Sequence, residues 1–125
     1  MANECIPLYR PGHDLTCVTT GAVVGKTFVD YSAAMTTGLP SVNTATSAGK
    51  TAGVAAYDAA SGSRVAIIRG KGTIVPMTCG AGGVTALAEV EVGASGRPVT
   101  FSAGVKQGRA LSTATAGNQI WIELY

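Results

Sequence analysis

The fold of this chain is indicated by the stretch Gly53-Val54-Ala55-Ala56-Tyr57-Asp58-Ala59-Ala60-Ser61-Gly62-Ser63-Arg64-Val65-Ala66-Ile67. Fifty-five residues later it has an echo, Gly108-Arg109-Ala110-Leu111-Ser112-Thr113-Ala114-Thr115-Ala116-Gly117-Asn118-Gln119-Ile120-Trp121-Ile122. Small and β-branched residues recur at matching offsets: Gly53/Gly108, Ala55/Ala110, Ala59/Ala114, Gly62/Gly117, Val65/Ile120 and Ile67/Ile122. Each copy predicts a short strand, a turn of small residues, and a second strand with alternating apolar positions. A duplicated strand-turn-strand unit is typical of a scaffold, and it indicates a structural protein.

The rest of the chain has the same pattern of short strands between glycine turns. The expected strands are Leu15–Thr20, Gly21–Tyr31 around a Gly25-Lys26 turn, Arg64–Arg69, Thr73–Val75, Ala88–Val92, Arg97–Phe101 and Ile120–Tyr125. Arg64–Arg69 and Thr73–Val75 are predicted to form a hairpin, with Pro76 ending the strand or lying on a sheet edge. No window has helical spacing, and interior glycines would weaken a helix. The sequence therefore predicts an all-β fold, a small barrel or sandwich.

The length and the first residues suggest how the chain is organised. A chain of 125 residues suits one domain, and we expect a single β-domain over residues 15–125. Residues 1–14 are predicted to be an extended arm, because Pro7 and Pro11 favour extended geometry. The apolar arm residues Ile6, Leu8 and Tyr9 must lie against some surface. Residues 32–52 are predicted to be a long flexible loop, since they offer little apolar bulk for burial.

The last strand predicts a contact surface. Ile120, Ile122 and Leu124 alternate toward one side, which is expected to face the core. Trp121 and Tyr125 then share the opposite face with Glu123. An aromatic pair on an outer face is typical of an interface.

Composition and charge argue against several classes of partner. Charged residues make up 13% of the chain, about half the usual share, so part of the surface is expected to be buried against other proteins. The net charge of +2 is spread singly, which gives no case for nucleic acid. No apolar run approaches the roughly 20 residues that cross a bilayer, and no secretory signal is visible. We therefore expect a protein made in a cytoplasm that has no membrane partner.

Four patterns could carry chemistry, and each has a simpler structural interpretation. Thr20–Thr27 resembles a phosphate-binding loop, but it has threonine where the first glycine is needed, and strand residues follow it. Cys5, His13, Cys17 and Cys79 lack the paired spacing of structural zinc ligands, so the cysteines are expected to be small buried side chains. The adjacent His13 and Asp14 have no nucleophile elbow to serve. Glu89 and Glu91 share one face of a strand and are predicted to be solvated. We expect no catalytic residue, metal or cofactor.

The C-terminal 75 residues resemble the small capsid decoration (cement) proteins of tailed bacteriophages. The resemblance rests on Gly53–Val75, on Val90-Glu91-Val92-Gly93 followed by Gly96-Arg97, and on the closing copy from Gly108 to Ile122. It implies a compact β-domain on the outer surface of a phage head, commonly a trimer, that stabilises contacts between major capsid protein subunits in the virion. The family has no catalytic residue or cofactor. Arg109 replaces Val54 of the first copy, so the second copy is expected to present a charge where the first is buried.

Together these observations assign two candidate sites. The capsid- or neighbour-binding arm comprises Ile6, Pro7, Leu8, Tyr9, Arg10 and Pro11. The homo-oligomer interface comprises Trp121 and Tyr125. Two alternatives stay open, a carbohydrate- or host-surface-binding module displayed on the virion and a minor tail component.

Overall fold

The computed structural model describes residues 14–125, and these are built almost entirely from β-strands. The strands are β1 (Asp14–Thr19), β2 (Phe28–Thr36), β3 (Leu39–Thr44), β4 (Gly53–Ala55), β5 (Arg64–Ile68), β6 (Ile74–Thr78), β7 (Glu89–Val92), β8 (Pro98–Thr100), β9 (Gly108–Ala110) and β10 (Gln119–Leu124). One 3₁₀ turn, η1 (Ala94–Gly96), is the only helical element in this part of the chain. The predicted all-β fold is confirmed. Within the described range no helix is long and apolar enough to cross a membrane.

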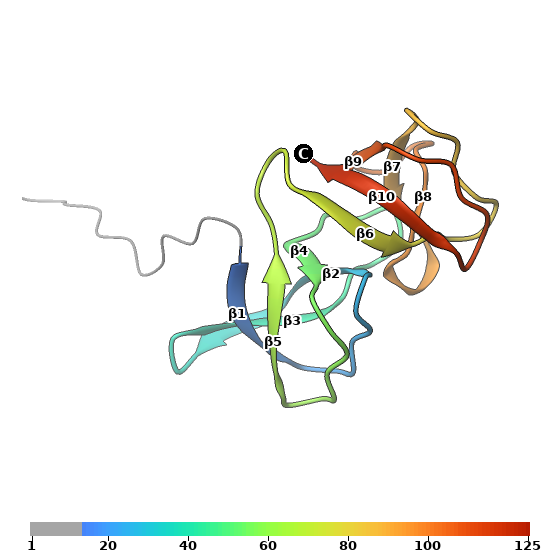
Figure 1. Ribbon diagram of the computed structural model, residues 1–125. Coiled ribbons are helices and arrows are strands. Elements are labelled where there is room, and N and C mark those ends of the chain that lie inside the picture. Colours follow the sequence, from blue (N-terminus) through green and yellow to red (C-terminus); the bar gives the residue numbers. More distant parts are fainter. Residues whose placement is uncertain (1–13) are drawn as a thin grey trace, which may run out of the picture.

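The strands form two units that follow one another along the chain (Figure 1). In the first half, β1-β3-β2-β4-β5 close into a barrel. In the second half, β6-β10-β9-β7-β8 form a five-stranded sheet. The segment Gly70–Gly72 leads from β5 to β6, and both glycines have positive φ, 115° and 85°.

The two halves share one topology and one register, so the predicted repeat is part of a larger duplication. In the first half, one row across the strands is Phe28, Val54, Ile68, Asp14. In the second half the equivalent row is Glu89, Arg109, Glu123, Ile74. Even the isolated bridges correspond, because Val23 pairs with Ala59 and Val84 pairs with Ala114. The sequence analysis found only the β4–β5 and β9–β10 part of this duplication.

The halves differ in how the barrel closes. In the first half β1 and β3 pair as parallel strands. In the second half the equivalent strands β6 and β8 do not pair as strands, and the Gly80 N–H donates to the Pro98 carbonyl at 2.8 Å. The edge of β6 that does not pair with β10 contacts the first half, because the Thr78 N–H donates to the Lys26 carbonyl at 3.1 Å. Segment 26–28 of the first half therefore lies against the open side of the second.

Burial shows that the halves are packed through shared side chains. Val29 and Ala55 point into the barrel of the first half, whereas their neighbours Phe28 and Val54 belong to the core of the second. Phe28 is fully buried there among residues such as Val90. The first two residues of β2 are thus buried on both faces, one in each core.

The long loop expected over residues 32–52 is wrong for most of its length. β2 continues to Thr36 and β3 covers Leu39–Thr44, so only the turn at residues 37–38 and residues 45–52 lack regular structure. The six residues from Tyr31 to Thr36 are all exposed. Because both faces of this part of β2 are exposed, its residues need not alternate between apolar and polar. The alternation that would have indicated a strand is therefore absent.

The hairpin expected between residues 64 and 75 is also wrong. β5 pairs with β1 and β4, and β6 pairs with β10, so the two strands belong to different sheets. Glycines with positive φ serve a linker as well as a hairpin turn, and the local sequence does not distinguish these cases. Pro76 does lie on a sheet edge, as predicted, because β6 ends its sheet.

One of the two glutamates predicted to be solvated is buried. Glu91 is 8% exposed, and its Oε2 accepts a hydrogen bond from the Gly104 N–H at 2.5 Å. The loop before β9 covers this part of β7. The alternation of the strand was read correctly, but a loop distant in sequence decided which positions meet water.

Candidate docking surfaces

The outer face of β10 carries the predicted aromatic pair. Trp121 and Tyr125 are 44% and 49% exposed, while Ile120 and Ile122 are fully buried behind them. The predicted orientation of this strand is confirmed. Whether the pair lies in an interface between copies stays a prediction.

Tyr125 belongs to a small polar network on this face. Its hydroxyl donates to Glu89 Oε2 at 2.7 Å, and Lys106 Nζ lies 3.1 Å from Glu89 Oε1. The Tyr125 hydrogen bond, and after it Lys106, holds the pKa of Glu89 below its usual range. The same hydrogen bond raises the pKa of Tyr125. This hydrogen bond joins the residue after β10 to the first residue of β7.

Three exposed aliphatic side chains belong to the strands of this sheet or to the segments next to them. Ile74, Leu87 and Leu111 are 53%, 61% and 41% exposed. Arg109 is also exposed, and it donates from Nε to the Leu87 carbonyl at 3.2 Å. Apolar side chains interspersed with anchored charges are the composition of a protein contact surface. We call Ile74, Leu87, Arg109, Leu111, Trp121 and Tyr125 the β10 face.

The duplication explains why this face is available. In the first half the equivalent positions Phe28 and Val54 are covered by the second half. In the second half those positions are Glu89 and Arg109, which face outward. The expected contrast between a buried Val54 and an outward-facing Arg109 is confirmed.

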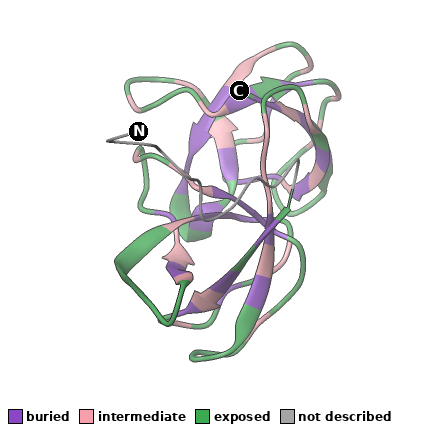
Figure 2. Ribbon diagram, turned by 90° about the vertical axis from the view of Figure 1, so that its left-hand side faces the viewer, coloured by how far each residue is buried: buried purple, intermediate pink, exposed green. Residues whose placement is uncertain are grey.

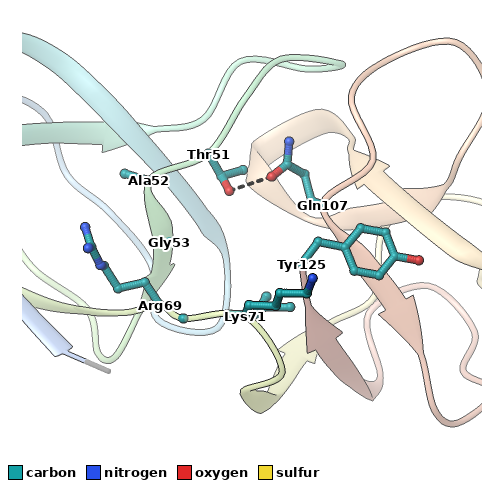
Figure 3. A pocket seen from close by; sticks show the side chains of 9 residues that line it. Thr51, Ala52, Gly53, Arg69, Lys71, Gln107 and Tyr125 are labelled. Atoms are coloured by element: carbon teal, nitrogen blue, oxygen red, sulfur yellow. Dashed lines mark hydrogen bonds between the residues drawn. The ribbon is translucent and has the colours of Figure 1, made fainter. Parts of the chain in front are cut away.

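A pocket of about 270 Å³ lies where the halves meet (Figure 3). It is lined by Thr51, Ala52, Gly53, Arg69, Gly70, Lys71, Gln107, Leu124 and Tyr125. Thr51 Oγ1 donates to Gln107 Oε1 at 2.9 Å, and Gln107 Nε2 donates to the Gly49 carbonyl at 3.4 Å. These bonds tie the segment before β4 to the segment before β9. The pocket is thus part of the junction between the halves.

A second exposed feature is the hairpin formed by β2 and β3, which extends beyond the barrel (Figure 1). Figure 2 shows the exposed residues in green, and residues 31–38 all belong to this class. Tyr31 and Met35 are 50% and 49% exposed. The pairing with β3 shifts register between Tyr31 and Ala33 and again between Ala33 and Thr36. The sequence analysis missed this surface, although a charge-free stretch from residue 31 to 42 was a usable signal.

The remaining predicted residues fall into two groups. The arm residues Ile6, Pro7, Leu8, Tyr9, Arg10 and Pro11, together with Cys5 and His13, lie outside the described residues. Cys17 and Cys79 are fully buried as predicted, each in a different core. Between residues 14 and 125 no cluster of potential metal ligands occurs. In the segment that resembles a phosphate loop, Asp58 already accepts the Gly25 N–H, and a strand follows.

Comparison with known proteins shows a similarity to a solved structure. No protein-family model and no curated protein sequence matches this chain. A similar solved structure is the N base of the head fiber protein gp8.5 of bacteriophage phi29. The TM-score is 0.76 at 15% sequence identity, over 90% of this chain and 92% of that chain. At this identity the similarity establishes the fold, and it covers both halves.

Proposed function

We propose that this chain is a structural protein of a phage virion that docks on the outside of the head. The observation that carries the proposal is the shared fold with the base of a phage head fiber, over nearly the whole of both chains. The small-residue patterns that resemble capsid decoration proteins support the same class independently. The β10 face and the β2–β3 hairpin offer two separate contact surfaces, as a protein between neighbours requires.

In the finer form of the proposal the chain is a cement protein that stabilises contacts between major capsid protein subunits, commonly as a trimer. A protein that binds two shell subunits at once stabilises the shell by linkage, because the bound state is available only to the assembled lattice. Several small interfaces acting together bind more tightly than each alone. No enzymatic activity, cofactor, nucleic acid or membrane partner is proposed.

The decisive experiment is electron microscopy of the parent particle with this protein present and after its removal. The proposal expects density on the outer head surface that disappears on removal, at hundreds of copies per particle. A handful of copies at the tail would instead identify a minor tail component. Density absent from the particle would refute the proposal.

The comparison favours a second candidate within the same class, the attachment base of a head fiber. The two candidates differ in what they do for the shell. Particles that lose a cement protein should rupture at a lower temperature and under a milder osmotic shock than complete particles. Particles that lose a fiber base should rupture under the same conditions as complete particles. Glycan binding by the purified protein would favour a host-surface module.

The proposed oligomer interface has its own test. Replacing Trp121 with alanine should loosen the homo-oligomer, because Trp121 supplies a large exposed apolar surface on the β10 face. Tyr57→Ala is the matched control, since Tyr57 is a 52% exposed aromatic residue of the first half. Sedimentation velocity should show a lighter species for the first variant only. An unaltered profile for Trp121→Ala would exclude this residue from the interface.

A further inference from the structure

The β2–β3 hairpin is longer than the duplicated fold requires. Tyr31 pairs with Val42 at its base, and the equivalent pair in the second half is Val92 with Pro98. Ten residues join the pair in the first half, whereas five residues, including η1, join it in the second. The turn can therefore be closed with half the length. The extra length extends the hairpin, and the side chains from Tyr31 to Thr36 are exposed on it.

One edge of this hairpin is open. β2 pairs with β4 only at Phe28 and Val29, while its pairing with β3 continues to Thr36. From Ala33 to Thr36 no described segment other than β3 bonds to the backbone of β2. Soluble proteins usually protect such an edge with charged side chains, and β-bulges also distort it. The pairing of β2 with β3 is irregular at two points here, but residues 31–36 contain no charge. The lack of charge indicates that the edge is covered in the assembled protein.

The segment before Asp14 has the sequence of a strand that can pair on one side only. In an extended chain, the N–H groups of residues 4, 6, 8, 10 and 12 point to one side, and those of odd-numbered residues to the other. Pro7 and Pro11 are both odd-numbered, so the even side keeps every donor. Proline occurs in sheets on edge strands with its nitrogen turned outward. Such a segment can complete one open edge and then prevents further addition.

We propose that residues 4–12 of one copy bind as an added strand along the open edge of β2, at residues 31–36, of a second copy. The thirteen residues before Asp14 span up to about 43 Å when extended, more than the radius of about 13 Å of a domain this size. The barrel is closed, so β3 on one side, or β5 and β4 on the other, separate β1 from β2 within one copy. The length of the arm is sufficient to leave its own barrel and reach the open edge of a neighbouring copy.

The contact joins two different surfaces, the arm of one copy and the hairpin of the next. Such a heterologous interface closes into a ring when its rotation is suitable. The inference therefore supplies a route to a cyclic oligomer, and it stands whether or not that oligomer binds a phage head. Main-chain hydrogen bonds give such strand addition its affinity.

The native Cys5 makes a direct test possible in the full chain. Ala33→Cys and Ala34→Cys place a thiol on each face of the exposed strand, and mild oxidation is followed by non-reducing electrophoresis. The proposal expects at least one variant to form covalent species larger than the monomer, and it expects none after Cys5→Ala is added. Crosslinking should fall on dilution. Circular dichroism should match the parent chain, because both sites are exposed.

Each other outcome overturns the proposal. Crosslinked dimers that persist in the Cys5→Ala background would mean that two β2 edges pair with each other. A disulfide that forms within one chain and leaves the monomer size unchanged would mean that the arm covers its own hairpin. Failure of both variants to crosslink at any concentration would mean that the arm lies elsewhere.

Discussion

At the scale of single residues, Glu89 is the group whose titration reports on the β10 face. Tyr125 donates to its carboxylate, and this bond is the main cause of its lowered pKa. Tyr125→Phe should raise the pKa of Glu89 toward its ordinary value, and Lys106→Gln should raise it too, because Lys106 contributes both a hydrogen bond and a charge. Carboxyl ¹³C shifts followed against pH measure both changes. Tyr57→Phe, in the first half, is the control and should leave Glu89 unchanged.

The sign of the linked stability follows from the lowered pKa. A carboxyl that titrates lower in the folded state stabilises the fold above its unfolded pKa, and the contribution disappears as pH falls through the folded pKa. The stability difference between the parent and Tyr125→Phe should therefore exist near neutral pH and vanish in acid. The difference should be small, because the pair lies in solvent. A difference that grew in acid would contradict the assignment.

Cys17 provides a second prediction at this scale. Burial in the barrel raises the pKa of its thiol to about 11, and burial raises the pKa of Cys79 as well. The thiolate is the reactive form, so neither residue should react with a thiol reagent at pH 8 in the native protein. In a Cys5→Ala variant, labelling should begin only when denaturant unfolds the chain. Rapid labelling of the native variant would show that one of the cores opens.

At the scale of elements, Gly53 and Gly108 should tolerate substitution equally badly. A Cβ on Gly53 would lie 2.7 Å from the Ile68 carbonyl oxygen, and one on Gly108 would lie 2.5 Å from that of Glu123. Gly53→Ala and Gly108→Ala should each lower the free energy of unfolding by about 1–3 kcal/mol, since the strands must move apart. Ser61→Ala, in an exposed turn, is the control. Denaturant titrations measure all three, and an unchanged midpoint at either glycine would contradict the shared geometry.

How much of this fold the sequence predicts depends on whether a strand meets the core. β10 was predicted in position and orientation because Ile120, Ile122 and Leu124 alternate, and the repeat identified β4, β5 and β9. The outer part of β2 was missed because residues 31–36 have no core to face, and β3 was missed because Val42 is the only one of its residues that belongs to the barrel core. The pairing of β5 with β1 could not be predicted, because β1 is distant in sequence and the local pattern of β5 does not indicate its partners. Of the candidate sites, only the aromatic face was visible in the pattern.

At the scale of the whole molecule, Phe28 belongs to the first half of the chain but should contribute to the stability of the second half. Its side chain is fully buried in the second core, so Phe28→Ala should cost about 3–5 kcal/mol. Amide exchange should accelerate in β6 and β10 as well as in β2. Tyr57→Ala, which removes an exposed aromatic ring, should change neither stability nor exchange by a comparable amount. Acceleration confined to the first half would show that the two cores are independent.

The row of Glu89, Arg109 and Glu123 sets how far the duplication can continue. The equivalent positions in the first half are the apolar residues Phe28, Val54 and Ile68. If the second half had apolar residues there, it would expose an apolar surface that could bind a further module. Chains could then associate end to end. The first half offers no open barrel edge for such a module either, because its own β1 and β3 pair and close the barrel. The contact that joins the first half to the second therefore cannot be repeated at either end of the molecule. If copies of this protein associate, as we propose, they must do so through other surfaces than the one that joins the two halves.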